Sequence, residues 1–456
     1  MACRLIPLLI FFCVGQSIAW AERAPNILLL IADDMTWRDC GPYGNDEVFT
    51  PNMNRLAEQG ICFDGMFTST AMCAPTRQQL YTGIWPVRNG AYANHSHVHQ
   101  GVKSIVHHLK GLGYRVGLNG KAHFGPKASF PFERVPGNGK EFIVRNPQQP
   151  YCLIVASDSP HRPWTEGPTE RYDPEGLTVP PYLIDTETTR SQLAAYYAEI
   201  TSLDAKLGQW IDWVDDSGQR DNTLLIFTSE QGSGFPFAKW TCYENGLKTA
   251  FIARWPAAIK PGTRTPAMCQ YIDVVPTFIE MAGGDPTLAD TGISGALDGD
   301  RNLDGRSFDG RSFLGVLLGR SEEHRKQVFG VHTTRGIIDG SKSYPVRSVR
   351  DARYKYIRNL NHSEAFTGLV LSDGGVYRAW REAAEADPKL RPRVRLISRR
   401  PAEELYDLAN DPYELNNLAD DDQLLAVKQR LGKELERWME QQGDRGEQTE
   451  LKVRPR

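Results

Sequence analysis

The feature that most constrains the fold is a set of four apolar runs of strand length, each followed at once by polar residues. The runs occupy residues 26–32, 114–118, 152–156 and 223–228. Unbroken apolar runs of this length are typical of strands buried on both faces of a parallel sheet. Residues 193–214 carry apolar side chains at helical spacing, and we expect this helix to pack on the sheet. The sequence therefore predicts an α/β fold, a mostly parallel sheet sandwiched by helices.

The residues that follow the four predicted strands are of types that bind ligands or catalyse reactions. In chain order they are Asp33 and Asp34, Lys121 and His123, His161, and Glu230 and Gln231. Ligands bind at the carboxyl ends of strands in open α/β sheets, so we expect these side chains to share one site. The two acid-containing pairs offer only hard oxygen ligands, which suit Ca²⁺ or Mg²⁺ and not zinc. Adjacent aspartates could equally cap a helix, and the second pair favours the metal.

A short helix is predicted to begin at Cys73. Pro75 stands where a first helical turn tolerates a missing N–H, and Gly83 stands where helices often end. A thiol at a helix N-terminus lies near the positive end of the helix dipole and near free backbone donors, which lower its pKa and attract anions. A lone cysteine is more often a small buried apolar residue, so a functional assignment depends on the surrounding motif.

The motif that begins at Cys73 resembles the signature of the type I, formylglycine-dependent sulfatases. Residues 73–83 read Cys-x-Pro-x-Arg-x-x-Leu-x-Thr-Gly, with Thr76 in the place of the commoner serine. Further stretches are similar to successive blocks of that family, in the family's order: residues 26–34, 120–123, 161–164, 227–232 and 404–418. The resemblance covers nearly the whole mature chain. It implies an alkaline-phosphatase-like fold and a sulfuric ester hydrolase or sulfamidase.

The resemblance also implies a role for each residue of these blocks. Cys73 would become formylglycine, made by a formylglycine-generating or anaerobic maturation enzyme, and its hydrate would attack sulfur. The implied ligands of one Ca²⁺ ion are Asp33, Asp34, Glu230 and Gln231, although the family usually has Asp followed by Asn or His at the last pair. The residues implied to surround the sulfate are Arg77, Lys121, His123, His161 and Lys239. We expect the cations to hold the sulfate oxygens, His161 to protonate the leaving group and His123 to orient or deprotonate the diol.

Three stretches resemble the heparan N-sulfatase (N-sulfoglucosamine sulfohydrolase) branch of the family. They are residues 120–132, 344–349 and 358–361. The residues expected to line the sugar subsite are His95, His97, His99 and Arg347. Lys239 stands where that branch is expected to carry an arginine, which is not an equivalent residue for bidentate sulfate contact. The first hypothesis is therefore release of sulfate from the end of a sulfated saccharide in glycosaminoglycan degradation, with N-sulfoglucosamine as the first candidate.

Three alternatives remain open. An exo O-sulfatase on another sulfated glycan fits the same motifs. A phosphoester or phosphonate hydrolase would share the architecture, but its two-zinc members need more His and Asp ligands than these strand ends supply. A catalytically silent glycan-binding relative is disfavoured by the intact string at residues 73–77.

Residues 1–21 predict a signal peptide, with Arg4, an apolar run and the cleavage site Ala19-Trp20-Ala21. That run is too short to span a bilayer and no later run is long enough. We therefore expect an exported protein without a membrane span, periplasmic or secreted, or lysosomal in a eukaryote. The formal net charge of −3 argues against a nucleic-acid partner. The eight cysteines predict no disulfide framework.

A second unit is predicted after the catalytic domain of residues 22–325. Within this C-terminal α+β subdomain, residues 326–456, four short runs predict half-exposed strands of a smaller antiparallel sheet. They are residues 328–331, 348–350, 354–357 and 404–408. Apolar residues from Leu424 to Trp438 predict a helix covering that sheet. The residues from Gln441 on are polar and are expected to be loose, and the segment 283–313 is expected to be a surface loop without calcium.

Overall fold

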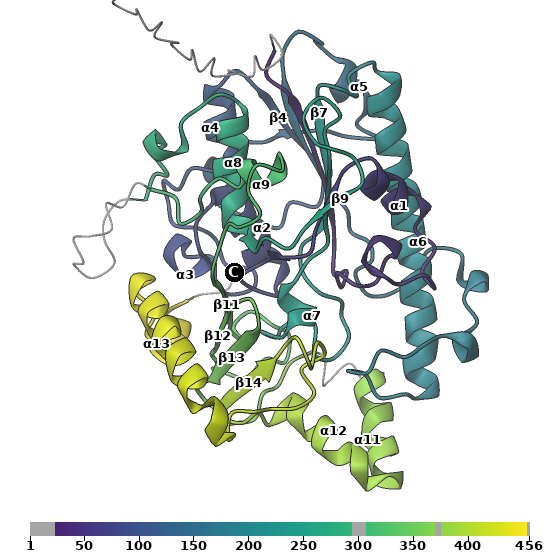
Figure 1. The fold of residues 1–456 in the computed structure, drawn as a ribbon, viewed down its shortest axis with the longest axis vertical. Coiled ribbons are helices and arrows are strands. Elements are labelled where there is room, and N and C mark those ends of the chain that lie inside the picture. Colours follow the sequence, from purple (N-terminus) through teal and green to yellow (C-terminus); the bar gives the residue numbers. More distant parts are fainter. Residues whose placement is uncertain (1–22, 294–306, 370–374, 454–456) are drawn as a thin grey trace, which may run out of the picture.

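The computed structural model describes residues 23–293, 307–369 and 375–453. The predicted signal peptide and part of the segment 283–313 lie outside these residues. An eight-stranded sheet forms the centre of the larger part of the chain (Figure 1). Its strands, in sheet order, are β5 (Glu133–Arg134), β4 (Arg115–Gly120), β6 (Tyr151–Ala156), β1 (Asn26–Ala32), β7 (Thr223–Ser229), β8 (Phe251–Arg254), β2 (Ile61–Phe63) and β9 (Thr263–Thr265).

The four apolar runs form four neighbouring strands at the centre of this sheet. Strands β4, β6, β1 and β7 are parallel, and Leu28 of β1 pairs with Leu153 on one side and Leu225 on the other. Only β8 runs antiparallel to its neighbours β7 and β2. The predicted mostly parallel sheet is confirmed. Because β1 and β7 are adjacent, the residues that follow them meet at one edge of the sheet.

Helices cover both faces of the sheet, as predicted (Figure 1). Successive residues of β1 enter two different cores, since side chains alternate across a strand. Ile27, Leu29 and Ile31 pack with α2 (Cys73–Thr82), α4 (Ile105–Gly111) and α8 (Val274–Met281). Leu28 and Leu30 pack with α1 (Pro51–Glu58) and with α6 (Glu187–Asp216), the long helix predicted from its apolar stripe.

The smaller elements of the first 325 residues connect these layers. They are β3 (Met66–Phe67), β10 (Cys269–Gln270), α3 (Pro86–Asn89), α5 (Lys140–Val144), α7 (Glu244–Leu247) and α9 (Leu314–Leu317). All six cysteines within the described residues are buried and free. Among the helices of the same residues, none combines the length and the apolar character needed to cross a membrane.

The C-terminal residues form the predicted four-stranded antiparallel sheet. Its strands are β11 (Val328–His332), β12 (Val346–Arg350), β13 (Tyr354–Asn359) and β14 (Glu403–Asp407). Helix α13 (Leu425–Gln441) packs Leu431, Leu435 and Trp438 against it, as expected. Two further helices, α11 (Val376–Ala386) and α12 (Arg391–Ser398), were not predicted.

The prediction that these strands are half-exposed is wrong, because both faces of the small sheet are covered. Most residues of the four strands are buried. On the face away from α13, Lys355 Nζ lies 3.1 Å from Glu244 of α7. At the edge of the sheet formed by β11, the backbone N–H of Val331 donates to the Ser69 carbonyl. The small sheet therefore packs directly on the main body, and the domain division at residue 326 stays a prediction.

The expectation that the chain is loose after Gln441 is also wrong. Residues 447–452 form α14 (Glu447–Lys452), and the side chain of Glu450 is fully buried. Asp444 forms a two-point ion pair with Arg347, in which Nη2 lies 3.0 Å from Oδ1. Polar residues at this end of the chain are ordered because buried partners from β11, β12 and their connection hold them.

Removing the Asp444 carboxylate is expected to destabilise the protein strongly. Asp444→Ala leaves Arg347 as an unpaired cation in a site that excludes water, which costs about 3–5 kcal/mol. Urea unfolding should show a lower midpoint at unchanged slope. The matched control is Glu133→Ala, which removes an exposed pair with Arg145 and should cost less than about 1 kcal/mol. Equal midpoints for the two variants would contradict this role of Asp444.

Candidate active site

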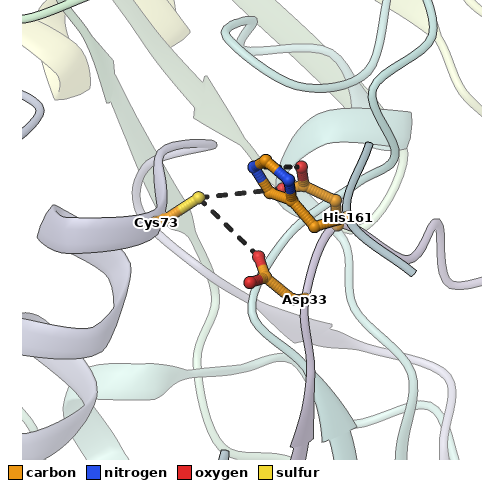
Figure 2. A group of neighbouring side chains, drawn as sticks. Asp33, Cys73 and His161 are labelled. Atoms are coloured by element: carbon orange, nitrogen blue, oxygen red, sulfur yellow. Dashed lines mark hydrogen bonds and ion pairs between the residues drawn. The ribbon is translucent and has the colours of Figure 1, made fainter. Parts of the chain in front are cut away.

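Cys73 begins helix α2 at the edge of the sheet where β1 and β7 end. Its N-cap Met72 has extended backbone, and Gly83 ends the helix at φ 69°, a conformation that glycine adopts without strain. The Cys73 Sγ lies 3.8 Å from the Oδ1 atoms of both Asp33 and Asp34, at the end of β1. Figure 2 shows the sulfur directed at Asp33, with His161 on the opposite side of the same small space.

Four oxygen-bearing side chains meet beside Cys73, as the strand order requires. They are Asp33, Asp34, Glu230 and Gln231, and all are buried. Gln231 Nε2 donates to Asp34 Oδ1 at 2.7 Å and to Glu230 Oε1 at 3.0 Å, and it lies 3.3 Å from the Cys73 sulfur. The two pairs predicted from separate strand ends therefore belong to one cluster.

Three cations surround the acidic cluster. Arg77 Nε, one turn after Cys73 on α2, lies 2.6 Å from Glu230 Oε2, and its Nη2 lies 3.7 Å from Asp33 Oδ2. Lys121 pairs with Asp33, and Lys239 Nζ lies 2.5 Å from Asp34 Oδ2. Each cation is thus held at the cluster by a carboxylate, where it could contact an anion bound beside Cys73.

The surroundings of the cluster shift the pKa values of Glu230 and Asp33 in opposite directions. Burial and the adjacent Asp33 carboxylate raise the pKa of Glu230 above its usual range, although Arg77 opposes this. Burial also acts on Asp33, but the hydrogen bond with Glu230 and the charge of Arg77 outweigh it and hold the pKa of Asp33 well below its usual range. Two buried carboxylates in contact share a proton in the absence of another cation.

The expected lowering of the Cys73 pKa is wrong. Burial, and then the charge of Glu230, raise the pKa of this thiol well above its usual value. A helix N-terminus stabilises an anion by about 0.3–1 kcal/mol at the surface, which is less than the cost of a thiolate among buried carboxylates. The thiol itself is therefore a poor nucleophile in this setting.

The donors of the cluster fit a hard divalent cation. Single ligand atoms of Asp33, Asp34, Cys73 and His161 lie within 4.8 Å of one another. The Oε1 atom of Gln231 is buried without a hydrogen-bond partner, and turning the amide would exchange it with the nitrogen that faces the carboxylates. Three carboxylates and an amide oxygen then match the ligands that Ca²⁺ prefers.

Two histidines flank the cluster. His161 Nε2 lies 3.5 Å from Asp34 Oδ2, and its Nδ1 lies 2.6 Å from the Arg162 carbonyl oxygen, which fixes the proton on Nδ1. His123 Nε2 lies 3.0 Å from His95 Nδ1. Burial, followed by the charge of Lys121, lowers the pKa of His123 to about 3, so its imidazole is neutral at pH 7 and can accept a hydrogen bond.

The residues predicted for the sugar subsite are not all brought to this place. His95 reaches it through its contact with His123. The His97 ring lies against Gly125, and the His99 ring lies against Gly90 at the end of α3.

Arg347 lies in a different cluster, and the structure does not bring it together with the other site residues. Its guanidinium is fully buried, and all its nitrogens are engaged by Asp444 and by the carbonyls of His332 and Val346. A side chain held in this way contributes to stability and has no free face for a saccharide, so its predicted role as a substrate ligand is withdrawn.

Trp240 is a neighbour of the site that the sequence did not suggest. It has φ 62°, which is rare for a bulky residue, and its backbone N–H donates to the Ala71 carbonyl just before Cys73. The Lys239 Nζ lies 5.3 Å from the centroid of its ring. Positive φ also occurs at Asp34, His95 and His123, so strained backbone gathers here. The only sequence signal that could have pointed to Trp240 is its position next to Lys239.

Comparison with known proteins identifies the class. A family model described as Sulfatase matches residues 25–140 and 132–284, which together are more than half of the chain. The chain belongs to the sulfatase family, as the residues around Cys73 predicted.

Two curated relatives extend over nearly the whole chain. An ulvan-active sulfatase of Formosa agariphila is 35% identical in an alignment of 446 positions that covers 94% of this chain and 82% of that protein. Human N-sulphoglucosamine sulphohydrolase is 27% identical in an alignment of 471 positions that covers 91% of this chain and 90% of that protein. Human N-sulphoglucosamine sulphohydrolase is therefore one of several curated sulfatases to which this chain is similar.

A solved structure shows the same fold. A protein in complex with its substrate, D-glucosamine-2-N,6-O-disulfate, superposes with a TM-score of 0.67 and covers 93% of this chain and 99% of its own. The sequence identity is 19%, so the likeness concerns the fold alone.

Proposed function

We propose that this protein is a formylglycine-dependent, calcium-binding sulfatase that releases sulfate from the end of a sulfated saccharide. The observation that carries the proposal is the meeting of Cys73, at the N-terminus of α2, with three cations and four oxygen ligands from separate strand ends. The raised pKa makes the Cys73 thiol a poor nucleophile. After conversion to an aldehyde hydrate, a hydroxyl group would attack in its place.

The chain supplies the surroundings of the reaction. Formylglycine would supply a hydroxyl nucleophile at residue 73, and bound Ca²⁺, held by the carboxylates of β1 and β7 and by Gln231, would supply positive charge beside it. Arg77, Lys121 and Lys239 would hold the sulfate oxygens, where their charge stabilises the transition state. Since they are already oriented by carboxylates, little reorganisation is needed when the sulfate binds.

The two histidines differ in the proton that each could move. His161 is 39% exposed in its side chain, so it can meet a leaving group that approaches from outside, and we propose it as the general acid. His123 is neutral and carries no charge that would compete with the cations, so we propose that it orients or deprotonates the diol.

The two curated relatives support two saccharide classes. We propose a saccharide from a sulfated polysaccharide as the substrate, with ulvan oligosaccharides favoured by the 35% identical relative and N-sulfoglucosamine by the human one. We further propose that the protein is exported through its N-terminal signal and is matured by a formylglycine-generating or anaerobic enzyme.

A substrate panel tests this function. The mature chain, co-expressed with a maturation enzyme, is assayed for sulfate released from ulvan oligosaccharides and from glucosamines sulfated at nitrogen or at single hydroxyls. We expect release from at least one saccharide, because the cations and Cys73 are intact. An aryl phosphonate monoester is included as a comparison. Hydrolysis of the phosphonate with no sulfate released from any saccharide would show that the function is the alternative one.

A further inference from the structure

Arg335 belongs to a turn whose backbone contacts the segment bordering the active site, and the proposed reaction does not use this residue. It lies in the turn after β11, where its backbone N–H donates to Thr333 Oγ1 at 3.2 Å. Its carbonyl oxygen accepts from the backbone N–H of Asn94 at 3.1 Å. The Asn94 side-chain nitrogen lies 3.2 Å from His95 Nε2, and His95 contacts His123. The C-terminal part of the chain thus places an arginine against the segment that borders the site.

The side chain of Arg335 lacks the counter-charge that several enclosed arginines of this protein have. Arg88 pairs with Asp309, Arg325 with Asp273 and Arg347 with Asp444. Within the described residues no acid pairs with Arg335, and its Nε is buried without a hydrogen-bond partner. Enclosing guanidinium N–H groups without partners is unfavourable. An arginine kept in this condition next to a site for an anionic substrate is suited to bind an anion.

The turn that carries Arg335 is fixed from the far end of the chain. The buried carboxylate of Glu450 accepts from the Thr334 backbone N–H at 2.9 Å and from the Thr333 hydroxyl group. Thr334 Oγ1 also donates to the Ser341 carbonyl at 2.7 Å. A preorganised turn loses little conformational entropy when a ligand binds, which makes it a suitable base for a specific contact.

We propose that Arg335 binds a second anionic group of the saccharide, a sulfate or a carboxylate, while Arg77, Lys121 and Lys239 hold the sulfate that is released. A guanidinium presents paired donors that match either group. This inference rests on the proposed function and adds that the preferred substrate carries at least two negative charges. Glu450 is then a positioning residue, which acts through the turn.

The test compares two forms of a saccharide that the wild-type enzyme cleaves. One form is the monosulfated monosaccharide, and the other is the same sulfated sugar joined to a uronate or carrying a second sulfate. For wild type we expect a higher kcat/KM for the form with the second anion. In Arg335→Ala this ratio should fall about 10- to 100-fold, mainly through KM, because one charge-assisted contact is lost. Arg335→Lys should recover part of it.

The control variant is Arg320→Ala, which removes an exposed arginine on the turn after α9 and should leave the ratio as in wild type. Arg335→Gln, which removes the charge and keeps most of the length, replaces the alanine variant if that one fails to fold. A ratio near one in wild type, or an unchanged ratio in Arg335→Ala and Arg335→Gln, would overturn the inference. Absence of sulfate release from every saccharide by wild type would instead overturn the proposed function.

Discussion

Replacing Cys73 with alanine should abolish sulfate release while leaving saccharide binding nearly intact. The change removes the precursor of the nucleophile but keeps Arg77, Lys121 and Lys239, which would hold the sulfate. Loss of a catalytic nucleophile costs several orders of magnitude in kcat, and we expect a fall of at least about 10⁴-fold. Sulfate release measures the first effect, and calorimetric titration with the saccharide measures the second.

The matched control for this experiment is Cys152→Ala. Cys152 is a buried cysteine near the start of β6, and it contributes to the core and not to the site. This variant should be somewhat less stable than wild type and should keep its activity. Turnover that survives in the Cys73 variant would show that another group attacks sulfur.

Calcium should stabilise the protein and be required for activity. A cation between Asp33, Asp34, Glu230 and Gln231 relieves the repulsion of carboxylates buried in contact. At a concentration of about 100 times Kd, such a ligand stabilises the native state by about 2.7 kcal/mol. Thermal unfolding of chelator-treated protein, with and without added Ca²⁺, measures this shift, and the sulfate assay measures the recovery of activity.

The informative variant for the metal site is Asp34→Asn. Asparagine tolerates the left-handed backbone at this position, where φ is 64°, so the variant should fold, but it loses a charged ligand. We expect the calcium-induced shift to be largely lost and sulfate release to fall at least about 100-fold. Glu133→Gln removes an exposed acid and should keep the full shift. Full activity of the chelator-treated wild type would contradict a role for calcium.

The central strands of the large sheet could be predicted from their composition. Strands such as β1 and β7 are buried along their whole length, so an unbroken apolar run marks them. Their polar ends could be assigned to one site from the general behaviour of such sheets, without knowledge of the strand order. The short edge strands β5 and β9 carry exposed polar residues and give no comparable pattern.

The C-terminal end could not be predicted from local sequence. Asp444 and Glu450 look like solvated residues in a polar tail, and only partners a hundred residues earlier bury them. For Arg347 the error was different, because this residue was expected in the sugar subsite and is buried elsewhere. Its block is similar to a family block, but similarity does not tell which face of β12 a side chain occupies, and this one faces Asp444.

The position of Cys73 at the start of a helix was predictable, but the direction of its pKa shift was not. The helix that begins at Cys73 and the nearby arginine follow from Pro75, Arg77 and Gly83. The sequence placed carboxylates in the same site as Cys73, but it did not indicate that burial and these charges would raise the pKa of its thiol. This raised pKa agrees with the proposal that Cys73 is the precursor of formylglycine and that its sulfur is not the reacting atom.

Mass spectrometry of the peptide that contains Cys73, combined with the sulfate assay on the same preparations, tests the central claim most directly. Preparations are made with and without a co-expressed maturation enzyme. We expect an aldehyde or its hydrate in place of the thiol, in a fraction that rises in proportion to activity. Full activity in a preparation whose Cys73 is entirely unmodified would contradict the proposed role of formylglycine.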